Sequence, residues 1–321
     1  MQLKKTLILA GRRRALPAWW ALPALCLGAG LALPAAAAPA AEEKAAITAL
    51  PGLVEGAQSN RDAAAWQNDL DERPIRALAP EPTPFTVDPG RLAIEVDLIN
   101  YAYDRHNPER ANERVHAFEW PITFRYGLLD DLELQFGMEA YVRESVRDRD
   151  AGTRQTTDGF GDLIIGAKYN LWGNDDWDQE IEGATALAVL PFLRLPTNRH
   201  GLGSRAVQGG VLVPFAIEDF AGFEIEWTPG FSAVRNSEDD GYEFEWSSLL
   251  VFNRGIVEGL GWYADFESIV NTESGQSWIG QVGGGLTWEL ADDTVLDVGV
   301  TFGVTRSADD FGAVLTLMQR F

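Results

Sequence analysis

The sequence has almost no cysteine. Its one cysteine, Cys26, lies in an apolar run near the amino end, so a chain cleaved after that run would contain none. Disulfides, thiol catalysis and cysteine-based metal sites are therefore excluded from the mature chain. Histidine is also rare, with three residues. The sequence predicts no metal site and no other cofactor.

Positive charge is scarce as well. The chain has 26 lysine and arginine residues against 48 acidic residues, which gives a formal net charge of -22. Residues 1–41 hold five of the basic residues and no acidic one, so their removal leaves -27. Because polyanions bind basic surfaces, we expect no nucleic-acid partner.

Residues 1–41 have the order of a secretory signal peptide. A basic region with Lys4, Lys5 and Arg12 precedes an apolar run over 15–33, and small residues offer a cleavage site at about 37–41. An uncleaved membrane anchor is the alternative, but the run is barely long enough to span a bilayer and is interrupted by proline and glycine. The order of these regions favours export and cleavage.

Residues 42–89 are expected to form a leader. Prolines crowd its second half, from Pro74 to Pro89, and such tracts favour extended conformations over packed elements. The segment is either a periplasmic tail or a plug that folds into the mouth of the following domain. The sequence leaves both open.

Helical periodicity is missing from residues 90–321. Apolar residues alternate with polar residues or glycine in long runs, as in Leu132, Leu134 and Phe136 against Glu133 and Gln135. We expect about twelve such runs, beginning near residues 91, 114, 131, 159, 183, 206, 222, 242, 258, 278, 293 and 311. The pattern predicts an all-β fold.

Two all-β architectures show this alternation: a soluble barrel or sandwich with its apolar face inward, and a transmembrane barrel with its apolar face outward. Runs of roughly 10 to 14 residues favour the second, since soluble strands usually have about five or six residues and tilted membrane strands about 9 to 11. We therefore predict a transmembrane antiparallel up-and-down β-barrel in the bacterial outer membrane, surrounded by its lipid.

Connection lengths predict the orientation of the barrel. Short connections are expected at 127–130, 218–222, 254–258 and 291–293, with a longer one at 173–183. They alternate with longer, charged connections that include 104–113 and 146–158. Outer-membrane barrels have short periplasmic turns and longer outer loops, so both chain ends are expected on the periplasmic side.

The polar faces of the runs predict the lining of the lumen. Twelve acidic residues share these faces with five basic ones, an excess that favours cations over anions in a narrow passage. The predicted lumen-lining residues are Glu133, Glu139, Arg143, Asp162, Lys168, Glu224, Glu226, Glu243, Glu245, Asp265, Glu267 and Asp297.

The chain ends in "FGAVLTLMQRF", an alternating run whose last residue is Phe321. Phe321 is expected to close the last lipid-facing strand against the first. A terminal aromatic on such a strand also resembles the assembly signal that the barrel insertion machinery reads. That machinery is therefore an expected partner.

Two stretches, "GFGDLIIGAKYNL" (residues 159–171) and "LDVGVTFGVTRSADDFGAVLTLMQRF" (residues 296–321), resemble the outer-membrane transporter family named for the meta pathway of phenol degradation. The resemblance covers roughly residues 85–321. It implies passage of small solutes, with aromatic or hydrophobic compounds as the class associated with the family. The leader lies outside it.

Catalysis has little support in the sequence. An outer-membrane lipid-modifying enzyme needs a paired histidine and serine, and His200 with Ser204 in "HGLGS" is the one pair to weigh. The stretch from Asp148 resembles a calcium loop but lacks its later carboxylates. We expect a monomeric or weakly oligomeric channel for small solutes that is not an enzyme, with a lipid-modifying barrel or a structural, adhesive surface barrel as alternatives.

Overall fold

The structure, a computed structural model, describes residues 82–105, 107, 112–174 and 183–321. These residues fall in one compact unit, and the predicted signal peptide and most of the predicted leader lie outside them. Within these ranges no helix is long and apolar enough to cross a membrane. The described residues form the strands β1 (Leu92–Asp104), β2 (Glu113–Leu129), β3 (Leu132–Asp148), β4 (Arg154–Gly159), β5 (Leu163–Trp172), β6 (Thr185–Leu195), β7 (Gln208–Leu212), β8 (Phe215–Phe220), β9 (Phe223–Arg235), β10 (Tyr242–Val257), β11 (Leu260–Asn271), β12 (Ile279–Ala291), β13 (Thr294–Gly303) and β14 (Phe311–Arg320).

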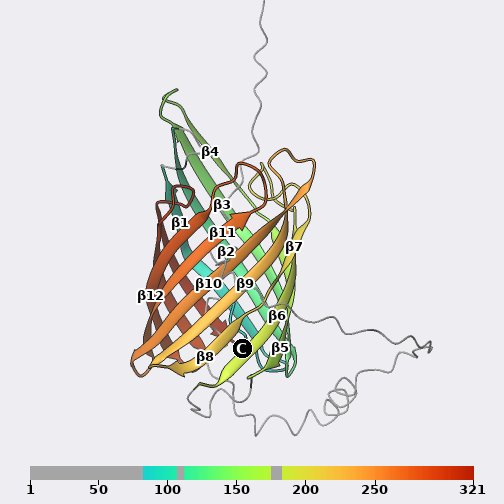
Figure 1. Cartoon of the computed structure of the whole chain (residues 1–321), viewed down its shortest axis with the longest axis vertical. Coiled ribbons are helices and arrows are strands. Elements are labelled where there is room, and N and C mark those ends of the chain that lie inside the picture. Colours follow the sequence, from blue (N-terminus) through green and yellow to red (C-terminus); the bar gives the residue numbers. More distant parts are fainter. Residues whose placement is uncertain (1–81, 106, 108–111, 175–182) are drawn as a thin grey trace, which may run out of the picture. The chain divides into compact units, whose positions relative to one another are not determined.

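The strands close into one antiparallel barrel (Figure 1). β4 and β5 both pair with β3, and β7 and β8 both lie between β6 and β9, so each couple acts as one interrupted barrel strand. The fourteen segments therefore make a closed barrel of 12 strands. The predicted fold class is confirmed, and each predicted run corresponds to one barrel strand.

Strands β14 and β1 close the barrel where the chain ends. Their register pairs Arg320 with Ala93 and Phe311 with Tyr103. Beyond the last pair, the backbone N–H of Phe321 donates to the carbonyl of Leu92 at 2.8 Å, and the N–H of Leu92 donates to the carbonyl of Phe321 at 3.2 Å. No strand edge is left unpaired at this seam, as a lipid environment requires.

Burial along the strands is the reverse of that in a soluble protein. Large apolar side chains such as Leu134, Phe136 and Trp288 are exposed on the outside, whereas Glu133 and Lys168 are almost completely buried. Alternation with a period of two sends successive side chains to opposite faces. A closed barrel with an apolar outer surface and a polar inner one is the outer-membrane arrangement, and the protein is an outer-membrane barrel.

The two ends of the barrel differ. At one end, here the turn end, lie both Leu92 and Phe321 and the short connections 130–131, 221–222, 258–259 and 292–293. At the other, here the loop end, lie the longer connections, which include 196–207 and 304–310. The predicted division into short and long connections agrees with this arrangement.

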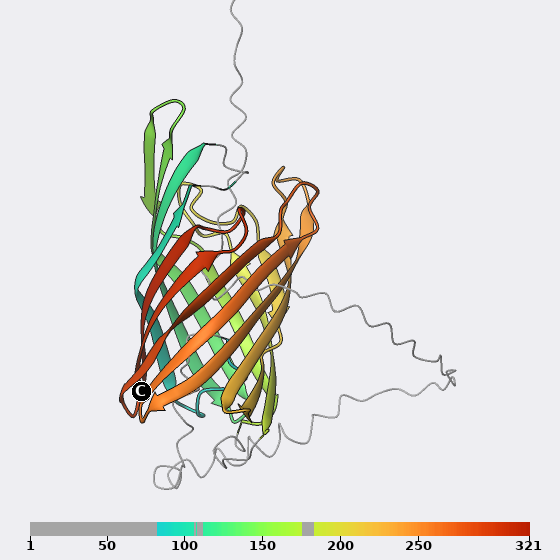
Figure 2. The ribbon, with the colours of Figure 1, turned by 60° about the vertical axis from the view of Figure 1, so that its left-hand side comes forward.

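Strands β2, β3 and β4 rise above the other strands at the loop end (Figure 2). β2 and β3 have 17 residues each, whereas β13 and β14 have 10. A transmembrane strand needs about 9 to 11 residues. The upper parts of β2 and β3 are therefore longer than the bilayer requires.

The prediction that Arg143 lines the lumen is wrong, because β3 contains a bulge. Trp120 pairs with Tyr141 but Pro121 pairs with Glu139, so Ala140 is an extra residue in the ladder. An extra residue shifts the alternation by one. Arg143 consequently shares the outer face with Tyr141 and is exposed, outside the lumen.

Candidate functional site: the barrel lumen

The turn end of the lumen is crossed by the segment that precedes β1. This segment, the strap (residues 82–91), includes part of the predicted leader, and Phe85, Thr86 and Val87 are almost completely buried in it. Its first residue, Pro82, accepts a hydrogen bond from Thr228 of β9 at 3.2 Å. Its later part reaches the opposite wall, where Val87 packs against residues of β1, β13 and β14.

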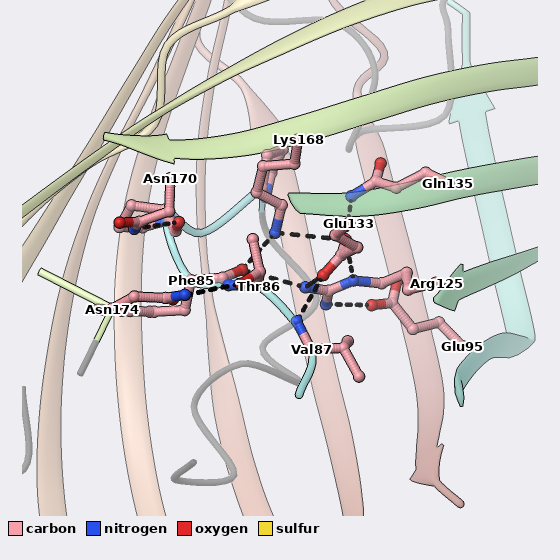
Figure 3. Close-up of polar contacts among 12 residues, drawn as sticks. Phe85, Thr86, Val87, Glu95, Arg125, Glu133, Gln135, Lys168, Asn170 and Asn174 are labelled. Carbon is pink, nitrogen blue, oxygen red and sulfur yellow. Dashed lines mark hydrogen bonds and ion pairs between the residues drawn. The ribbon is translucent and has the colours of Figure 1, made fainter. Parts of the chain in front are cut away.

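Side chains from the barrel wall hold the strap along its backbone (Figure 3). Lys168 of β5 donates to the carbonyl of Phe85 at 2.6 Å, and the N–H of Val87 donates to Glu133 of β3 at 2.8 Å. Asn170 donates to the carbonyl of Pro84 at 2.9 Å. Thus inward-facing polar residues satisfy backbone groups that would otherwise be buried without partners.

An ion-pair network lies directly beside the strap. Arg125 of β2 contacts Glu95 of β1 at 2.8 Å and Glu133 at 2.9 Å, and Lys168 lies 3.6 Å from Glu133. All four side chains are buried. Two positive charges therefore face two negative ones, a balance that buried charges need.

A second anchor joins the strap to the end of the chain. Arg320 of β14 contacts Asp88 of the strap at 3.1 Å and Asp293 of the β12–β13 turn at 2.7 Å. Val87, the residue before Asp88, packs with Ala93, Val295 and Met318. The strap is therefore attached to the first strand and to the last two strands of the barrel.

Above the strap, the inner wall of the barrel carries an apolar cluster. The cluster, here the apolar wall, runs from β5 to β11 and consists of Ile164, Leu190, Phe192, Leu212, Leu249, Val251 and Tyr263. All of these residues are buried inside the barrel. Sequence reasoning missed this surface, although β6 is apolar at almost every position in "TALAVLPFLRL", which is the signal of a strand buried on both faces.

Tyr263 links the apolar wall to the neighbouring strands β12 and β13. Its hydroxyl donates to Asp297 of β13 at 3.2 Å. A side chain at Gly285 would place its Cβ 2.6 Å from the Tyr263 hydroxyl oxygen, so glycine is required there for the ring to lie across β12. Tyr263 thus exposes an apolar ring and one polar hydroxyl group to the inside of the barrel.

Carboxylates line the inner wall beside Tyr263, on β11 and β13. Asp265 and Glu267 of β11 and Asp297 of β13 point inward, and Glu267 accepts a hydrogen bond from Gln281 at 2.8 Å. None of these three forms an ion pair with a described lysine or arginine. The described residues also contain no group of three metal-ligating side chains.

At the loop end of the lumen, Asp162 contacts several residues; it lies in the interruption between β4 and β5. Asp162 is fully buried. It accepts hydrogen bonds from the backbone N–H of Ser204 at 2.6 Å, from the Ser204 hydroxyl at 2.8 Å and from Asn198 at 2.7 Å. Arg194 lies 3.0 Å from Asp162 and also contacts Glu139. These contacts fix the connection 196–207 against the inside of the barrel.

The residues weighed for catalysis have other partners. The Ser204 hydroxyl donates to Asp162, and Nδ1 of His200 lies 3.0 Å from the carbonyl oxygen of Asp158. Asp148, in the stretch resembling a calcium loop, accepts from the backbone N–H groups of Asp150 and Ala151 in the β3–β4 turn. His200 and Ser204 are therefore held by other groups and not by each other.

Eleven of the twelve residues predicted to line the lumen alternate with outward apolar residues and lie on inner faces; Arg143 is the exception. Four of them, Glu133 and Lys168 at the strap and Glu139 and Asp162 at the loop end, form the ion pairs described above. Those on β9, β10, β11 and β13 are Glu224, Glu226, Glu243, Glu245, Asp265, Glu267 and Asp297.

One solved structure supports the barrel fold, and two others are more distant matches. The COG4313 outer membrane channel from Pseudomonas putida F1 is 13% identical, with 75% of this chain and 99% of that chain covered and a TM-score of 0.58. The NanC porin is 10% identical over 71% of this chain and 98% of that chain, with a TM-score of 0.45. The CymD monoaromatic hydrocarbon channel is 9% identical over 73% and 88%, with a TM-score of 0.37.

The family comparison covers most of the chain. None of the curated proteins compared matches the sequence. The sequence profile of the family described as "Putative MetA-pathway of phenol degradation" matches residues 78–321, which include the strap and the whole barrel. The protein therefore belongs to this phenol-degradation family of outer-membrane barrels, as the two sequence stretches indicated.

Proposed function

We propose that the protein is a channel that passes small, largely apolar solutes, aromatic compounds among them, across the outer membrane without catalysis. The observation that carries the proposal is the apolar wall, a cluster of seven buried side chains inside the barrel above the strap. Such a surface does not favour the passage of hydrophilic solutes. It favours apolar solutes, because their apolar surface is removed from water when they contact it. Membership of a phenol-degradation family supports the same class of solute.

We expect polar substitutions in the apolar wall to slow apolar solutes selectively. In Leu249→Asn combined with Val251→Asn, uptake of a radiolabelled aromatic hydrocarbon by cells producing the protein should fall severalfold, since each amide holds water that the solute must displace. Uptake of a neutral hydrophilic solute should not fall. Thr301→Asn, at an inner position of β13 away from the wall, is the control. Equal loss for both solutes would refute a specific role of the wall.

We also propose that the connections at the loop end face the exterior and that the turn end faces the periplasm, as the lengths of the connections indicate. The strap is then a plug at the periplasmic mouth, supported by its contacts with walls on opposite sides of the lumen. We also propose that the protein is a monomer or a weak oligomer, since the 12-strand barrel encloses a complete lumen without a partner.

The inner carboxylates should make the conductance prefer cations. Fixed negative charge in a narrow passage repels anions and concentrates cations. Asp265 and Glu267 lie on the inner face of β11 and form no ion pair with a described basic residue. Asp265→Asn combined with Glu267→Gln should shift the reversal potential in a salt gradient toward zero. The preference should weaken as the Debye length falls from about 10 Å at 0.1 M salt to about 3 Å at 1 M.

Glu238→Gln combined with Asp240→Asn is the matched control for charge, since both residues are exposed at the loop end. It should leave the selectivity unchanged. Anion selectivity of the unmodified protein at low salt would contradict the assignment of these carboxylates to the passage.

Phe321 should be required for efficient assembly. Its side chain is 62% exposed and contributes little to the packing of the folded barrel, so an effect of its loss on assembly points to recognition by the insertion machinery. We expect Phe321→Ala, which keeps the backbone hydrogen bonds to Leu92, to lower the amount of heat-modifiable barrel in the outer membrane. Gln155→Asn in the β3–β4 hairpin is the control. Equal assembly of the two variants would refute this role.

A further inference from the structure

An arginine cluster lies on the outer face of the tall strands at the loop end. The register places Arg114 of β2 directly opposite Arg147 of β3, and Arg147 directly opposite Arg154 of β4. Arg143 lies on the same face of β3, four residues before Arg147. These four residues are the arginine patch. It is an unusual gathering in a chain with net charge -22.

The patch faces outward. On β2, Arg114 shares its face with Phe118 and Trp120, and Trp120 is 46% exposed on the lipid side. The inner face of the same strands is covered, because Val115, Val142 and Val146 are buried. Arg143, Arg147 and Arg154 are exposed.

The protein balances only a small part of the positive charge of the patch. None of the four arginines forms an ion pair with a described residue, and Asp158, opposite Arg143, is the one described acidic residue paired with any of them in the ladder on this face. Arg154 donates to the hydroxyl of Ser145 at 2.8 Å, and Nε of Arg114 is buried without a hydrogen-bond partner. Like charges directly opposite each other destabilise a sheet, so the row of three arginines costs stability unless an anion joins it.

The patch lies directly above aromatic side chains. The rings of Phe118 and Trp120 are 5.6 Å apart, and those of Trp120 and Tyr141 are also 5.6 Å apart. Aromatic rings of this kind mark the level of the bilayer interface in outer-membrane barrels. The arginines therefore lie just above the acyl chains, at the level of the lipid headgroups.

We propose that the arginine patch binds the phosphorylated sugar headgroup of a glycolipid of the outer leaflet, whose acyl chains pack against Phe118, Trp120 and Tyr141. Arginine is suited to this role because its planar guanidinium binds phosphate oxygens through two parallel hydrogen bonds. The proposal depends on the loop end facing outward and is independent of the solute that passes through the lumen.

Native mass spectrometry of the purified mature protein in detergent, titrated with diphosphorylated lipid A or with its dephosphorylated form, tests the proposal. The protein should bind the diphosphorylated lipid much more tightly. Arg114→Gln, Arg147→Gln and Arg154→Gln together should abolish that difference, a loss of about fivefold per arginine and about a hundredfold in total. Arg199→Gln, Arg205→Gln and Arg306→Gln remove the same charge elsewhere at the loop end and should preserve it.

A heat-modifiable electrophoretic shift first establishes that each variant is folded. Equal binding of the two forms of lipid A by the unmodified protein would overturn the proposal. So would an equal loss in the two triple variants, since it would reflect the net charge of the loop end. Equally tight binding of the phosphorylated disaccharide without acyl chains would overturn the assignment to a lipid.

Discussion

Removing the strap is expected to raise the conductance of the barrel severalfold. A mature chain that lacks residues 42–88 keeps every barrel strand but loses the segment that crosses the turn end between Thr228 and Val295. Water then fills the mouth and hydrates the side chains that held the strap, among them Lys168 and Asn170. Single-channel recording in planar bilayers measures the change.

The matched control lacks residues 42–81 and retains the strap. It should conduct like the complete mature chain, because every contact of the strap described above begins at Pro82 or later. An equal conductance of both shortened chains would show that the strap does not limit the passage. A rise in the control alone would assign the restriction to the segment before it.

Arg125→Ala is expected to destabilise the barrel by about 3–5 kcal/mol, the usual effect of removing one partner of a buried ion pair. The substitution leaves Glu95 and Glu133 in the same buried site with Lys168 as the remaining base. Urea unfolding of the protein in detergent micelles gives the free energy of unfolding. Arg199→Ala, at an exposed position, should change it by no more than about 0.5 kcal/mol.

Two further variants identify the cause of the loss. Glu95→Gln in the Arg125→Ala protein should restore part of the stability, because it removes a negative charge that has lost its partner. Arg125→Ala should also cost much less in the chain that lacks the strap, where water replaces the missing guanidinium. If Arg125→Ala and Arg199→Ala have the same effect, the network does not stabilise the fold.

The barrel was predictable because the alternation that indicates each strand can be recognised within that strand alone. In β14, Phe311, Ala313 and Leu315 alternate with Gly312 and Thr316, and the period alone assigns each side chain to the lipid or the lumen. The number of runs then gives the number of barrel strands. Neither step requires knowledge of which strands pair.

Features that depend on pairing could not be predicted in this way. The bulge at Ala140 exists because Glu139 pairs with Pro121 and Tyr141 with Trp120, and nothing in the sequence of β3 alone marks the extra residue. The error at Arg143 follows directly from it. Thus a single inserted residue converted a predicted lumen residue into part of an outer surface.

The strap and the apolar wall depend on contacts between distant residues. Phe85 and Lys168 are 83 positions apart in the sequence, and the proline-rich composition of the leader suits an exposed tail as well as a buried segment. The apolar wall combines residues of five strands, of which β6 alone carried a signal. Composition and periodicity do not reveal such surfaces.

The attachment of the strap to both the first and the last strand of the barrel has a consequence for biogenesis. The strap precedes β1, yet Val87 packs against Met318 and Asp88 pairs with Arg320, near the last residue of the chain. These contacts can form only when β14 has arrived and the seam with β1 is closed. The attachment of the strap at Val87 and Asp88 is therefore completed at the final step of folding, and protection of this part of the strap from protease is expected to distinguish finished barrels from incomplete ones.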